Sequence, residues 1–232
     1  MCFSADADLV AGSVVGVLGI GALRQVRRPE ELALGVVPVV LAAHLLVEVP
    51  IWWGLSGGVA PDVLARAVSI YLVIALVVLP VLVPGSLRAV EPAGRRRSAM
   101  TAATALGASV AAVYLVAVVR GPITAEIQGH HLVYSENVPH GGLLAAAYVV
   151  VTCGPLLASS HRRIVAFGLA NIVAVAVLDW VARNGLTSLW CAWAAVTSLA
   201  ISAHLRMAHG PAASTTHPLR ARPPSPGDNA LA

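Results

Sequence analysis

Long apolar stretches alternate with short polar breaks along most of this chain, and each stretch is long enough, or nearly so, to cross a bilayer as a helix. The breaks are charged or rich in Gly and Pro, and the only long one spans residues 121–140. This pattern predicts an all-α polytopic membrane protein, a bundle of seven transmembrane helices. The helices are expected near 6–23, 32–53, 63–84, 99–119, 141–158, 164–182 and 186–205.

The arginines predict how these helices are oriented. Counted over alternate breaks, twelve arginines fall on one side of the membrane, and only Arg66, Arg120 and Arg183 fall on the other. Because basic residues are enriched in cytoplasmic loops, the N-terminus is expected outside and the C-terminus in the cytoplasm. The expected location is the inner (plasma) membrane of a bacterium. Residues 1–206 are expected to form the transmembrane domain, and residues 207–232 a disordered cytoplasmic tail.

The composition supports a membrane protein and excludes other classes. The 232 residues are 58% hydrophobic and 11% charged, whereas about 25% of the residues of soluble domains are charged. The net charge of +4 comes from arginines in short loops and in the tail, so nucleic acid is not an expected partner. The three cysteines lie far apart and lack metal-binding spacing. The lipid bilayer is therefore the expected environment.

The second predicted helix contains an acid within its apolar run. A charged side chain at the centre of a membrane helix costs about 2.5–3.5 kcal/mol on insertion scales. His44, Glu48 and Trp52 are spaced four residues apart, so they share one face of the helix. Pro50 removes a backbone donor and is expected to kink the helix. Because intramembrane acids are functional by default, Glu48 is a candidate catalytic residue, with His44 as its orienting partner.

The predicted orientation places a second acid, Asp179, and most large aromatic residues at the same depth as Glu48. This convergence predicts an outward-opening cavity that contains both acids as catalytic residues. The substrate-binding residues are expected to be His44, Trp52, Trp53, Tyr71, Tyr114, Trp180, Trp190 and Trp193.

Each of these features also has a purely structural explanation. A buried acid can be hydrogen-bonded across the bundle, Asp179 can pair with Arg183, and tryptophans form belts at membrane surfaces. The histidines of the long loop have irregular spacing, which is weak support for a metal site. The segment Ser159-Ser160-His161 is expected in a cytoplasmic turn. A nucleophilic triad there would need a buried acid on that side, and none is predicted.

An acid beside aromatic rings suggests one kind of reaction. A carboxylic acid in an apolar site can stay protonated at neutral pH, and it can then protonate an alkene or epoxide where water is excluded. Aromatic faces stabilise the carbocation that forms. A second carboxylate can orient the first acid or accept the terminating proton. A lipid-soluble polyprenyl substrate would also explain why the site lies in a membrane.

Two motifs resemble those of a known group of proteins. The start Met1-Cys2-Phe3-Ser4-Ala5 and the segment 188–195, SLWCAWAA, are similar to a family of small bacterial seven-helix membrane proteins that begin MCFSA and contain S-x-W-C-x-x-A-A. More loosely, the layout resembles the small membrane-bound terpene cyclases of fungal meroterpenoid and bacterial indole-sesquiterpenoid pathways. That resemblance implies two intramembrane acids that start cyclisation by protonation, and Glu48 and Asp179 would fill those places.

The leading hypothesis is an integral membrane terpene cyclase, an isomerase or lyase acting on a hydrophobic prenylated small molecule. No acidic cluster of the DDxxD kind is present, so ionisation of a diphosphate is disfavoured and no metal or cofactor is predicted. One alternative is a proton-coupled transporter or lipid-binding membrane protein, although the inner halves of the helices look too apolar for proton transport. A second is an intramembrane metal-dependent hydrolase that uses His44, His131 or His140.

Overall fold

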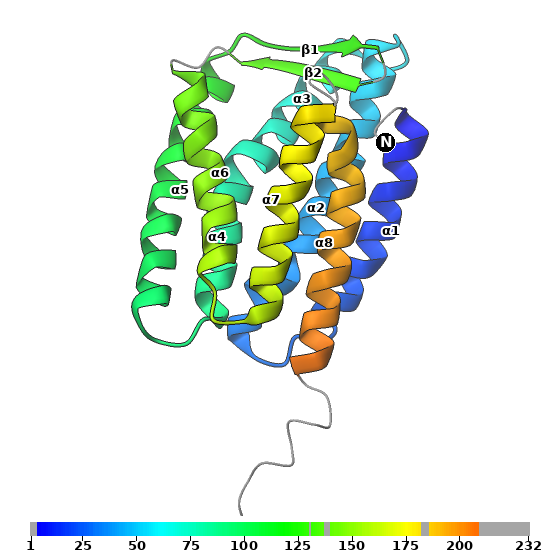
Figure 1. The fold of residues 1–232 in the computed structure, drawn as a ribbon. Helices are drawn as coiled ribbons and strands as arrows, with labels where there is room; N and C mark the ends of the chain where they lie inside the picture. Colours follow the sequence, from blue (N-terminus) through cyan, green and yellow to red (C-terminus); the bar gives the residue numbers. More distant parts are fainter. Residues whose placement is uncertain (1–3, 130, 137–139, 182–185, 209–232) are drawn as a thin grey trace, which may run out of the picture.

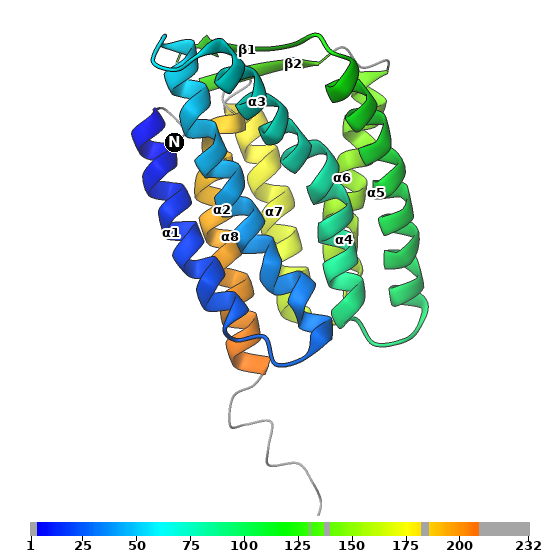
Figure 2. The same cartoon turned by 180° about the vertical axis from the view of Figure 1, so that it is seen from behind.

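The chain forms an upright bundle of helices with a two-stranded hairpin across one end (Figures 1 and 2). The computed structural model describes residues 4–129, 131–136, 140–181 and 186–208, and their side chains except at 131, 136, 175–181, 186–193 and 208. The elements are α1 (Ala5–Leu23), α2 (Pro29–Leu55), α3 (Pro61–Leu72), the π-helical segment η1 (Val73–Val78), α4 (Leu79–Val90), α5 (Arg95–Arg120), β1 (Ile123–Gln128), β2 (His131–Glu136), α6 (Gly141–Ala158), α7 (Arg162–Val181) and α8 (Leu186–Ala208).

All seven predicted helices are present in the described residues, when α3, η1 and α4 are counted as the one continuous helix Pro61–Val90. Five of them are long and apolar enough to cross a membrane, namely α1, α2, Pro61–Val90, α5 and α6. The start of α1 and the end of α8 lie at opposite ends of the bundle (Figure 1). The full count of seven spans and the orientation in the membrane stay predictions, and the predicted tail beyond residue 208 lies outside the described residues.

Local sequence signals set where several helices begin and end. The Ser4 side chain accepts a hydrogen bond of 3.3 Å from a backbone amide in the first turn of α1. Prolines occupy the first positions of α2 and α3, where a missing amide hydrogen costs nothing. Gly121 ends α5 with φ of 55°, a conformation that favours glycine. The helix α2 continues through Pro38 and Pro50.

The all-α prediction is wrong for the loop 121–140, where β1 and β2 pair as an antiparallel hairpin. Apolar and polar residues alternate in the first part of this segment, from Ile123 to Gln128, which is the period of a strand with one buried face. Ala125 pairs with Tyr134 in the ladder, and Leu132 is only 2% exposed. Gly129, with φ of 64°, lies in the turn between the strands. The hairpin therefore covers the end of the bundle with its apolar face inward (Figure 1).

Five helices form a ring, and the other two pack against its outside. The ring consists of α2, α4, α6, α7 and α8, while α1 packs against α2 and α8, and α5 packs against α4 and α6. The outer surface is strongly apolar, with Val17 71% exposed, Val119 76% exposed and Leu143 74% exposed. Such a surface is expected where lipid surrounds the protein.

Small residues bring α1 close to α2. The buried residues of α1 are Asp8, Gly12, Val15, Gly19 and Ala22, which form one stripe at helical spacing. A Cβ added at Gly12 or Gly19 would meet side-chain or backbone atoms of α2 at 2.8–3.0 Å. Glycines therefore permit the close approach that brings the side chains at the start of α1 against α2.

Replacing Gly107 with alanine should separate α4 from α5. A Cβ at this position would lie 2.0 Å from the Pro80 carbonyl oxygen, so the two helices must move apart. We expect a loss of about 1–3 kcal/mol, the usual cost of overpacking, measured as a lower midpoint of thermal unfolding in detergent. Gly154→Ala in α6 is the control, because nothing lies within 4 Å of its added Cβ. Equal midpoints for the two variants would show that the close approach is not required.

Candidate functional site

Glu48 is buried at the hairpin end of α2, with 2% of its surface exposed. The Tyr134 hydroxyl of β2 donates a hydrogen bond of 3.1 Å to Glu48 Oε1. The Tyr71 hydroxyl of α3 lies within hydrogen-bonding reach of both Glu48 and Tyr134. Two phenols from different elements therefore hold the carboxyl, which offsets the cost of removing it from water.

Three rings stack beside this carboxyl. The His44 and Tyr71 rings have centroids 4.0 Å apart, and the Tyr71 and Tyr134 rings have centroids 4.5 Å apart. Tyr71 lies in the middle of the stack and is 6% exposed. Burial raises the pKa of the Tyr134 hydroxyl well above its ordinary value, so this hydroxyl stays protonated and remains a donor to Glu48. The stack fixes the positions of both phenols.

A second carboxyl comes from α1. Asp8 has no exposed surface, and its Oδ2 accepts a hydrogen bond of 2.8 Å from the Trp52 indole nitrogen. Asp8 also interacts electrostatically with Glu48. Because Trp52 lies one turn after Glu48 on α2, this bond joins the start of α1 to the site. The site thus contains two acids, Glu48 and Asp8.

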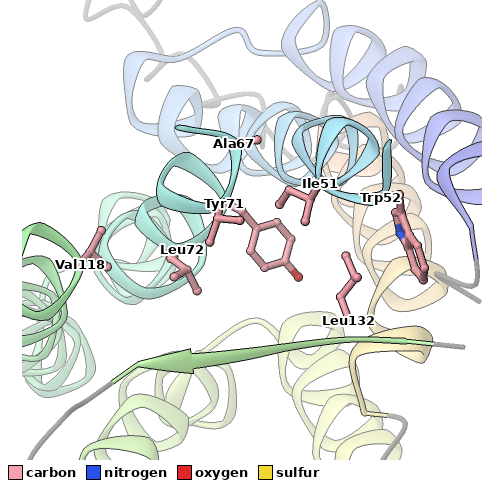
Figure 3. Packing of buried hydrophobic residues seen from close by; sticks show 8 residues of the cluster. Ile51, Trp52, Ala67, Tyr71, Leu72, Val118 and Leu132 are labelled. Carbon is pink, nitrogen blue, oxygen red and sulfur yellow. The ribbon is translucent and has the colours of Figure 1, made fainter. Parts of the chain in front are cut away.

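Apolar side chains close the space around these groups. Ile51 of α2, Leu72 of α3 and Leu132 of β2 belong to one buried cluster that also includes Tyr71 and Trp52. Figure 3 shows Leu132 projecting from the strand toward the helices, with Tyr71 in the space between them. The hairpin therefore shields the acids from water at this end of the bundle.

The structure brings together Glu48, His44, Trp52 and Tyr71 from the predicted site. Trp53 lies outside this group and is 48% exposed. The side chains of the other predicted residues on the last two helices, namely Asp179, Trp180, Trp190 and Trp193, lie outside the described residues.

Tyr114, also predicted to bind substrate, lies elsewhere. It is 5% exposed on α5 and interacts electrostatically with Tyr148 of α6. The Tyr148 hydroxyl donates a hydrogen bond of 2.8 Å to the Ala75 carbonyl oxygen in η1. A π-helical turn lacks regular α-helical hydrogen bonding, so Tyr148 supplies a donor where the backbone pattern changes.

Sequence reasoning missed Asp8 and the role of Tyr134. Asp8, Gly12 and Val15 fall on one face of α1, and this stripe of small residues could have indicated the face that contacts α2. Tyr134 falls in the long break 121–140, where the alternation along Ile123–Gln128, followed by Gly129, could have indicated a hairpin whose second strand contains Tyr134.

A cavity of about 900 Å³ lies within the ring of five helices. Leu41, Leu79 and Ala194 line it near the middle of the bundle, and Arg163 and His204 line it toward the end opposite the hairpin. Among the described residues, neither Glu48 nor any tryptophan lines it. This open volume lies farther along the bundle than Glu48, and the predicted cavity containing both Glu48 and Asp179 stays a prediction, because the side chain of Asp179 lies outside the described residues.

The turn Ser159-Ser160-His161 lies against a buried acid, so the prediction that none is buried on that side is wrong. Glu91 is 3% exposed and accepts hydrogen bonds from the Ser159 hydroxyl (3.0 Å) and the Ser160 amide (2.9 Å). The His161 ring contacts His204 edge to face, with centroids 5.6 Å apart. These contacts fix the turn between α6 and α7.

A comparison with protein families assigns the chain to one of them. The chain belongs to the family of unknown function DUF6629. The family model matches residues 1–216, a range that includes every described helix and both strands. No curated protein and no solved structure matches the chain. The evidence for the function of this DUF6629 member therefore lies in the geometry of its own residues.

The hydrolase alternative would need several metal-ligating side chains of this DUF6629 member to lie together. No group of three or more His, Cys, Asp or Glu side chains in the described part of the chain is placed to hold a metal ion. His44, the buried histidine of the hydrolase alternative, stacks on Tyr71. The side chain of His131 lies outside the described residues.

Replacing Asp8 should destabilise the protein more than replacing Asp6. Asp8→Ala leaves the Trp52 indole N–H without its acceptor inside the bundle, which we expect to cost about 1–3 kcal/mol. Asp8→Asn keeps an oxygen for this bond and should cost less. Asp6→Ala is the matched control, because Asp6 is exposed two residues earlier. Thermal unfolding in detergent measures all three, and equal midpoints for the two alanine variants would contradict a link between α1 and α2.

Proposed function

We propose that this protein binds a long apolar chain, a lipid or a linear prenyl chain, within the membrane. The observation that supports this proposal is the cavity of about 900 Å³ inside the ring of helices. Ligand pockets commonly have volumes of about 300–1,000 Å³. A cavity of this size in an apolar ring suits a molecule that enters from the bilayer.

Two of the polar side chains in the cavity wall form hydrogen bonds within the protein, which supports an apolar ligand. Asn171 donates a hydrogen bond of 3.3 Å to the Cys153 sulfur, and Thr152 donates one of 2.8 Å to the Tyr148 carbonyl oxygen. Most of the remaining wall is aliphatic. Because these polar groups are satisfied within the protein, a bound chain needs few polar groups along its middle.

Terpene cyclisation is a second candidate function, and it is supported by the acids at the hairpin end. Glu48 would transfer its proton to the terminal alkene or epoxide of a linear prenyl chain. The π electrons of a second double bond would then attack the cation and close a ring. Loss of a proton from the final cation to a carboxylate would balance the reaction and give an isomer of the substrate.

The surroundings of Glu48 fit this second function in three ways. Trp52 offers an aromatic face that stabilises a cation, and Tyr71 would offer one when its stack with His44 and Tyr134 opens. Asp8 supplies a second carboxyl close enough to interact with Glu48, the part that Asp179 was expected to play. The hairpin and the apolar cluster keep water from a reactive cation.

Filling the cavity should block binding of an apolar chain. Ala200 lines the cavity, so Ala200→Trp should weaken the binding of tritiated geranylgeraniol to purified protein by at least about tenfold, or about 1.4 kcal/mol. Leu199→Trp is the control, because Leu199 is the preceding residue, is 59% exposed and does not line the cavity. Equal affinities in both variants would contradict binding in this cavity.

Removing the acid should stop cyclisation without stopping binding. Purified protein would be incubated with geranylgeraniol and with its terminal epoxide, and the products analysed by gas chromatography and mass spectrometry. Glu48→Gln keeps the size of the side chain but cannot supply the proton, so the rate should fall at least about 100-fold. Asp62→Asn, at an exposed acid of α3, should retain full activity. Full activity in Glu48→Gln would rule out this mechanism.

A further inference from the structure

The two ends of the cavity differ in charge. Toward the hairpin, the lining residues Leu41, Leu79 and Ala194 belong to one apolar core cluster. At the opposite end the lining includes Arg163, at the start of α7, and His204, near the end of α8. The cavity is therefore apolar along its length and basic at one end.

The buried acids near the basic end are engaged by other groups. Glu91 accepts hydrogen bonds on both of its oxygens from the turn between α6 and α7. Glu31 accepts a hydrogen bond of 3.1 Å from the Arg27 amide and also interacts electrostatically with His204. Neither acid lines the cavity, and no carboxylate among the described residues does. The charge of Arg163 is therefore not neutralised by the cavity wall.

Arg163 and His204 both have hydrogen-bonding groups without a partner among the described residues. Within the described part of the chain, Arg163 forms no hydrogen bond or ion pair. His204 Nδ1 is buried and has no hydrogen-bond partner among the described residues. The two side chains are also close enough to interact electrostatically. An anion placed between them would offset the charge of Arg163 and accept a hydrogen bond from the buried nitrogen.

We infer that the cavity binds an anionic amphiphile, with a carboxylate or phosphate head at Arg163 and His204 and one long apolar chain along the ring. The guanidinium of Arg163 suits this head, because its fork of N–H groups matches two oxygens of a carboxylate or phosphate. The inference rests on the proposed binding of an apolar chain. It adds that the head of the ligand is negatively charged and lies at the end of the cavity opposite the hairpin.

Three probes with the same chain and different heads test the inference. Geranylgeraniol is uncharged, geranylgeranoic acid has a carboxylate, and geranylgeranyl monophosphate has a phosphate. Binding would be measured to the purified full-length protein in an uncharged detergent. At least one anion should bind roughly tenfold more tightly than the alcohol. The tighter of the two anions identifies whether the head is a carboxylate or a phosphate.

Two neighbouring arginines provide a matched pair of variants. Arg163→Gln should abolish the preference for the anion over the alcohol, and the alcohol binding that it retains also shows that the variant is folded. Arg162→Gln should keep the preference, because Arg162, exposed like Arg163, does not line the cavity. Arg163→Lys keeps the charge without the fork, and it should retain part of the preference.

The outcomes separate this inference from the proposed function. Equal affinities for the alcohol and both anions in the unmodified protein would overturn the anionic head while leaving the binding of an apolar chain intact. Equal losses in Arg162→Gln and Arg163→Gln would also overturn it, because general surface charge would then explain the preference. If none of the three probes binds, the proposed binding of an apolar chain fails together with the inference.

Discussion

One carboxyl group that must be satisfied in a dry interior determines much of the structure. Glu48 is held by Tyr134 of β2 and lies within reach of Tyr71 of α3. Asp8 of α1 acts on the same group and is fixed by Trp52. A buried carboxyl without such partners costs several kcal/mol. The hairpin is therefore part of the site, because removing it from the bundle end would expose this acid and separate it from its donor.

The sequence predicts the helices well because each is long, apolar and bounded by charged or Gly/Pro-rich breaks. The helical period also places His44, Glu48 and Trp52 on one face, and all three are buried. Contacts between distant segments could not be predicted in this way. The bond from Tyr134 to Glu48 joins residues 86 positions apart, and it depends on how the hairpin lies across the bundle. The cavity is likewise invisible in the sequence, because it is the volume left between five packed helices.

The interrupted helix Pro61–Val90 connects the acid site with the cavity. Tyr71, just before η1, belongs to the ring stack beside Glu48. Leu79, just after η1, lines the cavity. Within η1 the Ala75 carbonyl accepts a hydrogen bond from Tyr148, another lining residue. Because π-helical turns are frequent at functional sites, we interpret η1 as the element that allows one helix to serve both regions.

The distance between cavity and acid distinguishes the two proposed functions. Leu41 lines the cavity and precedes Glu48 by seven residues, or about 10 Å along α2. A chain held by its head at Arg163 would point its far end toward Glu48, and the terminal double bond of a linear prenyl chain lies at that far end. Between them lie Leu45, which is 1% exposed, and His44, which stacks on Tyr71. Cyclisation therefore requires this stack to open when the chain binds, whereas simple binding leaves it closed.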